Sequence, residues 1–321
     1  MDAPLKVAVV IPCFRVRAHA LGVIESIDAS VARIYVIDDS CPEGTGEYVR
    51  AQCTDQRVTV LFNPRNLGVG GAVMRGYEAA LSDGMDVIVK VDGDGQMDPR
   101  LIPKFVAPIA AGEADYAKGN RFFNLEHIRS MPGIRIFGNT VLSFMTKLSS
   151  GYWDIFDPTN GFTAIHREVA GQLPLEKISQ RYFFETDMLF RLNTLRAVVV
   201  DVPMDARYGS DISNLRIPSI VGEFLVRHLG NLAKRIFYNY YLRGMSIASF
   251  ELPLGILMLL GGLLYGSLHW ARSAQAGVTT PPGTVMISAI LIIVGVQFIL
   301  AFINYDIANV PQRTLHRKSR S

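Results

Sequence analysis

Two long apolar runs near the end of the 321-residue chain constrain its fold more than any other feature. They cover 252–271 and 284–303, and each has about 20 residues without Asp, Glu, Lys or Arg. A helix of that length rises about 30 Å, which is the thickness of the hydrocarbon core of a bilayer. Buried core helices are the alternative, but these usually carry a polar stripe, which both runs lack. We therefore expect two transmembrane helices.

The charges around these runs predict their orientation. The segment between them carries only Arg272, whereas basic residues flank the pair on both sides: Arg227, Lys234, Arg235 and Arg243 before it, and Arg313, Arg317, Lys318 and Arg320 after it. Positive flanks stay in the cytoplasm, so we expect a hairpin with both ends inside. The early apolar run VAVVIPCF is too short for a signal peptide, which places residues 1–215 in the cytoplasm.

Composition excludes some partners and favours others. The net charge of +3 is too small to indicate a nucleic-acid partner. The basic residues cluster beside the apolar runs, which favours anionic lipid headgroups as partners. The three cysteines have no CxxC spacing and are expected to be free thiols. Residues 216–250 combine apolar positions at helical spacing with interleaved basic residues. This pattern predicts juxtamembrane amphipathic helices in the membrane interface, with packing on the preceding domain as a compatible alternative.

Residues 1–215 alternate between strand-like and helix-like segments at short spacing, which is typical of an α/β fold with a doubly wound, Rossmann-like sheet. The expected strands are 6–14, 32–37, 58–62 and 86–91, and the expected helices are 18–29, 44–53 and 70–82. In such sheets ligands bind beyond the carboxyl ends of the strands. Three polar or proline-containing clusters follow strands, at Pro12, at Asp38-Asp39 and at Asp92–Asp94, so we expect one shared site.

The carboxylates of Asp92 and Asp94, separated by one glycine after a strand, suit a divalent metal. Mg²⁺ or Mn²⁺ prefers such hard oxygen ligands and would bridge them to a diphosphate. A simple turn is the alternative for the same letters. Asp39 would accept hydrogen bonds from a base or ribose, whereas a helix cap is the alternative for the Asp38-Asp39 pair. The glycine-rich segment 63–76 lacks the GK[ST] ending of a P-loop and is expected to form a tight helix entry near the ribose or sugar.

These segments, in order, resemble glycosyltransferase family 2. The matching runs are VVIPCF, VIDDS, NLGVGGAVMRGY, KVDGDGQMDP, KGNRF, DPTNGF and RYGSDIS. More narrowly they resemble its dolichyl-phosphate mannose synthase branch and the bacterial bactoprenyl-phosphate glycosyltransferases. The resemblance implies a GT-A catalytic domain with a mixed sheet over 1–215, juxtamembrane helices over 216–250 and a two-helix anchor with a basic tail over 251–321. It also implies a multi-pass protein of the bacterial inner membrane.

The resemblance implies roles for particular residues. Pro12, Asp38 and Asp39 would bind the nucleotide, and Asp92, Asp94 and Gln96 would hold the metal and the donor diphosphate. Arginines at matching positions would meet phosphate groups, because a planar guanidinium can bind two oxygens at once; they are Arg121, Arg135 and Arg207. Asp157 would lie near the reacting centre, with a helix cap as its alternative, and Glu185 and Asp187 would lie where many relatives carry a base.

The reaction expected is inverting transfer of a sugar from a nucleotide-sugar to polyprenyl phosphate, with glucose from UDP-glucose as the first choice. GDP-mannose, a UDP-N-acetylhexosamine, a UDP-aminoarabinose type of donor or a non-lipid acceptor are the alternatives, and a non-catalytic membrane adaptor is the rival class. A lipid monophosphate is already largely dianionic at neutral pH. The carboxylates should therefore position groups more than remove protons, and homo-oligomerisation is left open.

Overall fold

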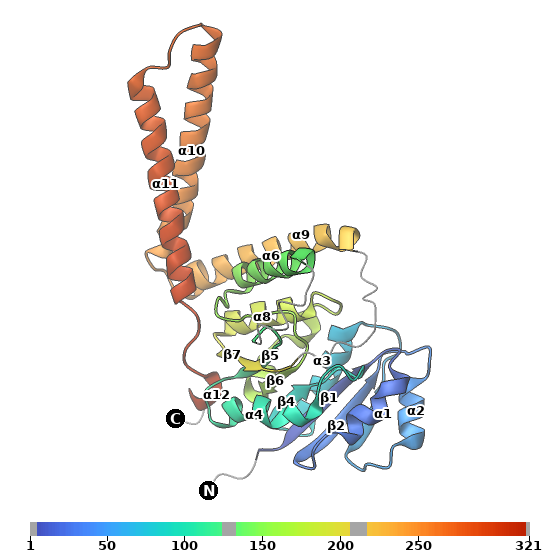
Figure 1. The fold of residues 1–321 in the computed structure, drawn as a ribbon. Coiled ribbons are helices and arrows are strands. Elements are labelled where there is room, and N and C mark those ends of the chain that lie inside the picture. The colour runs from blue at the N-terminus through green and yellow to red at the C-terminus, as the bar shows by residue number, and fades with distance from the viewer. Residues whose placement is uncertain (1–4, 124–132, 206–216, 319–321) are drawn as a thin grey trace. The chain divides into compact units, whose positions relative to one another are not determined.

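The computed structural model describes residues 5–123, 133–205 and 217–318, without the side chains of 134–137, 217–221 and 318. The chain divides into two compact units, the first formed by residues 1–232 and 311–321 and the second by residues 233–310. Each unit is described by itself. The first holds the sheet and the helices that flank it, and the second holds two long helices (Figure 1).

Within the described ranges, the first unit has one seven-stranded mixed sheet with the order β3-β2-β1-β4-β6-β5-β7. Its strands are β1 Val7–Cys13, β2 Val31–Asp38, β3 Val58–Phe62, β4 Val87–Lys90, β5 Tyr116–Asn120, β6 Thr163–His166 and β7 Val199–Pro203. β6 runs antiparallel to both of its neighbours, whereas the other adjacent pairs are parallel. The parallel strands β1, β2, β4 and β5 therefore end at one edge, and β6 begins there.

Helices cover the sheet and continue into the second unit (Figure 1). They are α1 Arg17–Glu25, α2 Thr45–Gln52, α3 Val69–Ser82, α4 Ile102–Ala110, α6 Gly133–Ser150, α7 Arg167–Ala170, α8 Phe184–Leu195, α9 Ile217–Phe237, α10 Ala248–Gln275, α11 Pro282–Ala308 and α12 Leu315–Lys318. Strands β1 and β4 are buried along their whole length, which explains why they are apolar except for Lys90 at the end of β4. The α/β fold predicted from the alternating pattern is confirmed, and the predicted elements differ from the observed ones by a few residues at most.

The first part of α9 packs on the first unit through polar contacts. Arg227 Nη1 donates to Ser179 Oγ over 2.9 Å, and Asn231 Nδ2 donates to Asp187 Oδ1 over 3.2 Å. His228 Nδ1 lies 2.8 Å from Ser149 Oγ of α6. Apolar side chains on the same stretch of helix, including Leu225, Val226 and Leu229, are exposed. The first part of α9 therefore packs on the preceding domain through polar side chains and leaves apolar side chains exposed; its location in a membrane interface stays a prediction.

The segment that follows α11 returns to the first unit, at the sheet edge opposite the carboxyl ends of the parallel strands. Asp115, just before β5, is fully buried and accepts the backbone N–H groups of Val198 and Leu315. Its Oδ1 also lies 2.7 Å from Nδ1 of His316, whose ring stacks on that of His166. The two connections to the second unit are thus both fixed to the first unit by buried polar groups.

In the second unit, α10 and α11 form an antiparallel hairpin with small residues between them. A Cβ on Gly255 would lie 2.9 Å from the carbonyl oxygen of Gly295, and a Cβ on Gly295 would lie 2.6 Å from the backbone nitrogen of Leu259. Ser288 Oγ donates to the carbonyl oxygen of Gly262 over 2.9 Å. Small residues and hydroxyl bonds of this kind are typical of helix pairs in lipid. Both helices are long and apolar enough to cross a bilayer.

A buried ion pair closes the base of this hairpin. Arg235 donates from Nη1 and Nη2 to the two carboxylate oxygens of Asp306, over 2.6 and 3.0 Å, and both side chains are 2% exposed. Tyr240 Oη also donates to Asp306 over 2.6 Å. A buried charge that loses its partner costs about 3–5 kcal/mol, whereas removal of both charges can be nearly neutral.

We therefore predict that Arg235→Met and Asp306→Asn each lower the melting temperature of the detergent-solubilised protein, and that the double variant loses less than the sum. Glu223→Gln, which removes the exposed ion pair with Arg227, is the control and should cost less than about 1 kcal/mol. The four variants are compared with wild type by thermal unfolding. Strictly additive losses in the double variant would contradict a coupled buried pair.

Candidate active site

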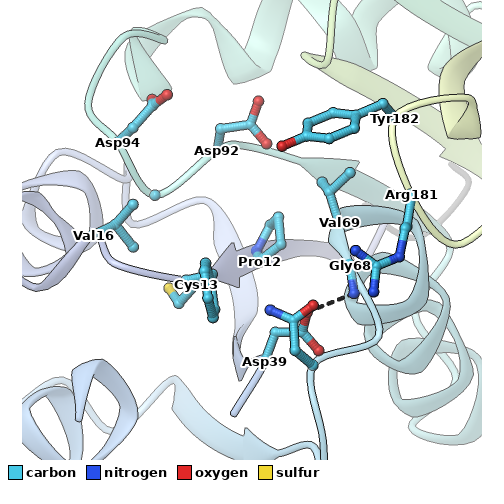
Figure 2. A pocket seen from close by; sticks show the side chains of 13 residues that line it. Pro12, Cys13, Val16, Asp39, Gly68, Val69, Asp92, Asp94, Arg181 and Tyr182 are labelled. Carbon is cyan, nitrogen blue, oxygen red and sulfur yellow. Dashed lines mark hydrogen bonds between the residues drawn. The ribbon is translucent and has the colours of Figure 1, made fainter. Parts of the chain in front are cut away.

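A cavity of about 700 Å³ opens at the carboxyl edge of the sheet (Figure 2). The segments that follow β1, β2 and β4 contribute to its wall, together with the entry of α3 and the loop before α8. Its lining residues are Pro12, Cys13, Phe14, Val16, Asp39, Asn66, Gly68, Val69, Asp92, Gly93, Asp94, Arg181 and Tyr182. The shared site expected from the strand ends is thus one cavity, and Pro12, Asp39, Asp92 and Asp94 meet in it.

Asp39 and Asp38 face different surroundings although they are adjacent. Asp39 lines the cavity, and its carboxylate accepts the side-chain amide of Asn63 and the backbone N–H groups of Leu67 and Gly68, over 2.7 to 2.9 Å. Asp38 accepts the backbone N–H groups of Cys41 and Gly46 and so fixes the entry of α2. Asp39 lines the cavity, whereas Asp38 does not and instead holds the entry of α2, whose N-cap residue is Gly44.

Asp92 and Asp94 stand at the other end of the cavity (Figure 2). Burial raises the pKa of Asp94, and the negative charge of Asp92 adds to that rise. The backbone N–H of Gln96 donates to Asp94 Oδ1 over 3.0 Å, while the Gln96 side chain does not line the cavity. A cation in the cavity beside these two carboxylates would favour the charged form of Asp94.

The donor set fits a divalent metal held jointly with a ligand. In the part of the chain that the structure describes, no group of three or more His, Cys, Asp or Glu side chains could hold a metal ion. Mg²⁺ and Mn²⁺ commonly use one or two carboxylates and complete their shell with phosphate oxygens and water. Asp92 and Asp94, which face the cavity, match that pattern.

Two fully buried lysines lie beneath this acidic end. Lys90 Nζ is 2.7 Å from Asp92 Oδ1 and 3.9 Å from Glu185 Oε1, and it donates to the carbonyl oxygen of Gly161 over 3.0 Å. Lys118 Nζ donates to the carbonyl oxygen of Asn160. Burial raises the pKa of Glu185, although the two lysines oppose that rise. Burial also lowers the pKa of Lys90, but Asp92 and Glu185 outweigh it and the net shift is upward.

Arg121 and Asp157 form a bidentate ion pair at the end of β5. Arg121 Nε donates to Asp157 Oδ2 over 2.7 Å, and Arg121 Nη2 donates to Asp157 Oδ1 over 3.1 Å. Asp157 is fully buried, and although burial raises its pKa, the hydrogen bonds from Arg121 outweigh that effect and lower it. Asp157 is therefore an ionised partner of an arginine rather than a helix cap, and Arg121 is held in place while one-third of its side chain stays exposed.

The remaining site residues predicted from the sequence lie elsewhere or outside the described residues. Asp187 accepts from Arg191, Ser179 and Asn231, so it anchors the start of α8 and does not line the cavity. Arg135 lies in α6, but its side chain is outside the described residues, and so is all of Arg207.

Sequence reasoning missed four residues at or below the cavity, namely Lys90, Lys118, Arg181 and Tyr182. The available signal for the lysines was a charged residue next to apolar strand residues, in VIVKV for Lys90 and in YAKG for Lys118. Arg181 and Tyr182 lie in a loop before a helix, where an arginine and a tyrosine are ordinary surface residues and give no signal.

Comparison with known proteins agrees with this geometry. Residues 8–173 match the model of glycosyl transferase family 2. A polyprenol monophosphomannose synthase from Mycolicibacterium smegmatis is 28% identical over 61% of this chain and 75% of its own length. An undecaprenyl-phosphate mannosyltransferase from Micrococcus luteus is 30% identical over 53% of this chain and 70% of its own length.

Solved structures agree on the fold. Glucosyl-3-phosphoglycerate synthase from Mycobacterium tuberculosis, in complex with Mn²⁺, UDP and phosphoglyceric acid, superposes with a TM-score of 0.55 at 20% identity. The match covers 72% of this chain and 78% of that chain. Since the family model spans just over half of the sequence, the chain belongs to glycosyl transferase family 2. It is a glycosyltransferase with a GT-A-like mixed sheet, as the motifs predicted.

Burial lowers the pKa of Lys118 to about 8, which makes the stability of the protein depend on pH. The unfolded chain binds this proton more tightly than the folded one, because an unburied lysine has a pKa near 10.5. Stability contributed by this group therefore rises with pH between about 8 and 10.5, by on the order of 3 kcal/mol in total.

Lys118→Met should remove this dependence. The melting temperature of wild type relative to the variant should rise from pH 7.5 to pH 10, and Lys104→Met, at an exposed lysine, should follow wild type at every pH. Differential scanning calorimetry in detergent over this range is the measurement. Parallel curves for wild type and Lys118→Met would show that the buried lysine does not carry the effect.

Proposed function

We propose that the chain transfers a sugar, with inversion, from a nucleotide-diphosphate sugar to polyprenyl phosphate at the cytoplasmic face of a bacterial inner membrane. The observation that carries the proposal is the cavity at the carboxyl edge of the sheet. It presents Asp39 at one end and Asp92 and Asp94 at the other, in a chain that also has two long apolar helices. The names of two relatives, which refer to polyprenol and undecaprenyl phosphate products or acceptors, support the acceptor class.

The donor would bind along the cavity. Pro12 and Asp39 would line its nucleoside end, as Asp39 presents a carboxylate held by two backbone N–H groups. Asp92 and Asp94 would hold Mg²⁺ or Mn²⁺ with the donor diphosphate, and Gln96 would support Asp94. Such a metal, when bound, neutralises negative charge that develops on the departing nucleoside diphosphate. Lys90 fixes the Asp92 carboxylate from below, so its orientation is set before the donor enters.

The acceptor would be a phosphate held by arginines. Arg121 is fixed by Asp157, and we propose Arg135 and Arg207 as further phosphate contacts on the basis of the motifs alone. A phosphate monoester has a second pKa near 6, so its oxygen needs little deprotonation before it attacks the anomeric carbon. Asp157 would therefore act by orienting Arg121. Glu185, which lies 3.9 Å from Lys90, would offset the charge of that buried lysine. Positioning and electrostatics would supply most of the rate enhancement.

The membrane would bring enzyme and acceptor together. We propose that residues 1–215 form the catalytic domain, that 216–250 lie at the membrane interface, and that 251–321 hold two spans and a basic cytoplasmic tail. The hairpin of α10 and α11, with its glycine-lined contact, supports two spans. A phosphate that cannot leave the headgroup plane is then met by a catalytic domain confined to the same surface.

The identity of the sugar is decided by a donor panel. Glucose from UDP-glucose is our first choice, and mannose from GDP-mannose is its main competitor, because two relatives are named for mannosyl transfer. UDP-N-acetylhexosamines and a UDP-aminoarabinose type of donor complete the panel. Each donor is incubated with purified protein, polyprenyl phosphate and Mg²⁺ or Mn²⁺, and the lipid is then analysed by mass spectrometry. A non-catalytic adaptor would give no product with any donor. An enzyme with a non-lipid acceptor would leave the lipid unchanged and consume the donor only by transfer of the sugar to water.

We predict that Asp94→Ala lowers metal-dependent transfer at least about a hundredfold, because loss of one of two carboxylates removes the metal from the leaving group. Initial rates with radiolabelled donor and polyprenyl phosphate are the measurement. Glu113→Gln removes an exposed acid before β5, at the opposite edge of the sheet, and should keep the wild-type rate. Near-wild-type transfer by Asp94→Ala would show that the metal assignment is wrong.

A further inference from the structure

The loop before α8 brings one unassigned cation into the cavity. Figure 2 shows Tyr182 reaching toward Asp92 and the Arg181 guanidinium lying near Asp39 and Gly68. We propose that Arg181 binds the phosphate of the donor that is attached to the nucleoside, and so selects donors that carry a diphosphate. This inference rests on the proposed function, because it assigns a residue to the donor site named there.

The loop packs closely against the glycine-rich entry of α3. The backbone N–H groups of Gly70 and Gly71 donate to the carbonyl oxygen of Gln180, over 2.9 and 3.2 Å. A Cβ on Gly70 would lie 2.3 Å from the carbonyl oxygen of Ser179, and a Cβ on Gly68 would lie 2.6 Å from that of Gln180. Only glycine allows so close an approach between two backbones. The glycines therefore fix the loop that carries Arg181.

The other side of the loop is fixed as well. The backbone N–H of Ser179 donates to Asp187 Oδ2 over 2.9 Å, and the Ser179 hydroxyl accepts from Arg227. The carbonyl oxygen of Arg181 accepts the backbone N–H of Phe184 at the first turn of α8. The backbone at Arg181 is thus held on both sides, while its side chain is exposed to the cavity. A pre-organised arginine loses less conformational freedom on binding a ligand.

The charge of the cavity wall indicates what this arginine binds. Among the described residues that line the cavity, Asp39, Asp92 and Asp94 are acids and Arg181 is the only lysine or arginine. Beneath the wall, Lys90 and Glu185 carry opposite charges. One divalent cation therefore balances Asp92 and Asp94, and Arg181 is the cation that the described lining offers to the diphosphate. A guanidinium supplies a matching fork of donors for phosphate oxygens. Because Arg181 lies toward Asp39 rather than Asp94, it would meet the phosphate nearer the nucleoside.

Stacking of the guanidinium on the base is the rival role, and pyrophosphate separates the two because it has no base. Binding of UDP and of pyrophosphate, each with Mn²⁺, is measured by calorimetry for wild type, Arg181→Ala and Arg181→Lys. Arg33→Ala is the matched control, since it removes the same charge from an exposed position near the start of β2. Arg181→Ala should bind both ligands at least about tenfold more weakly, Arg181→Lys should recover part of the loss, and Arg33→Ala should match wild type.

Three outcomes would overturn the proposal: equal UDP affinity in wild type and Arg181→Ala, a loss for UDP without a loss for pyrophosphate, or an equal loss in Arg33→Ala. A melting temperature of Arg181→Ala near that of wild type confirms that the variant is folded. If wild type itself fails to bind UDP, GDP and pyrophosphate in the presence of either Mg²⁺ or Mn²⁺, the donor site is wrong. The proposed function then fails with it. Binding by wild type that Arg181→Ala leaves unchanged refutes only the role of Arg181.

Discussion

The buried ammonium of Lys90 lies 2.7 Å from Asp92 Oδ1 and organises the carboxyl edge of the sheet around it. A lysine that is fully removed from water needs an anion and hydrogen-bond acceptors nearby. Asp92 and the carbonyl oxygen of Gly161 supply them, and Glu185 adds a second negative charge. A Cβ on Gly161 would lie 2.4 Å from Lys90 Nζ and 2.7 Å from Asp92 Oδ2, so a side chain there would displace this ion pair. The end of β4, the loop before β6 and the start of α8 are therefore tied together by one cation.

This arrangement explains why glycines occur in two of the sequence motifs. The glycine of DPTNGF makes room for the Lys90–Asp92 pair, and the glycines of NLGVGG make room for the loop that carries Arg181. Neither set of glycines needs to bind phosphate directly. Both act by allowing a second segment to approach closely, which places charged side chains on the wall of one cavity. Asp92 is thus supported from below, and the end of the cavity near Asp39 is supported from the side.

The parts predicted from the sequence are those that local patterns determine. Apolar runs ended by Pro12, Asp39 and Asp92 predicted the strand ends, because the spacing of apolar residues is a local property of the sequence. Their common edge was predicted because parallel strands of α/β sheets generally end at one edge. Pairing between distant segments could not be predicted in this way. The Arg121–Asp157 pair joins residues far apart in the chain, and Asp187 accepts hydrogen bonds from Ser179 and from Asn231 of α9. Arg181 looked like an ordinary surface arginine until the fold placed it in the cavity.

The central claim is that the cavity between Asp39 and the Asp92–Asp94 pair binds a nucleotide diphosphate through a divalent metal. An experimental structure of the full chain with UDP and Mn²⁺ tests it most directly, with GDP in a parallel sample. We expect density for the metal within about 2.0–2.3 Å of carboxylate oxygens of Asp92 or Asp94, and density for the nucleoside beside Asp39. Nucleotide bound elsewhere on the chain, or bound in the cavity with no metal at Asp92 and Asp94, would contradict it.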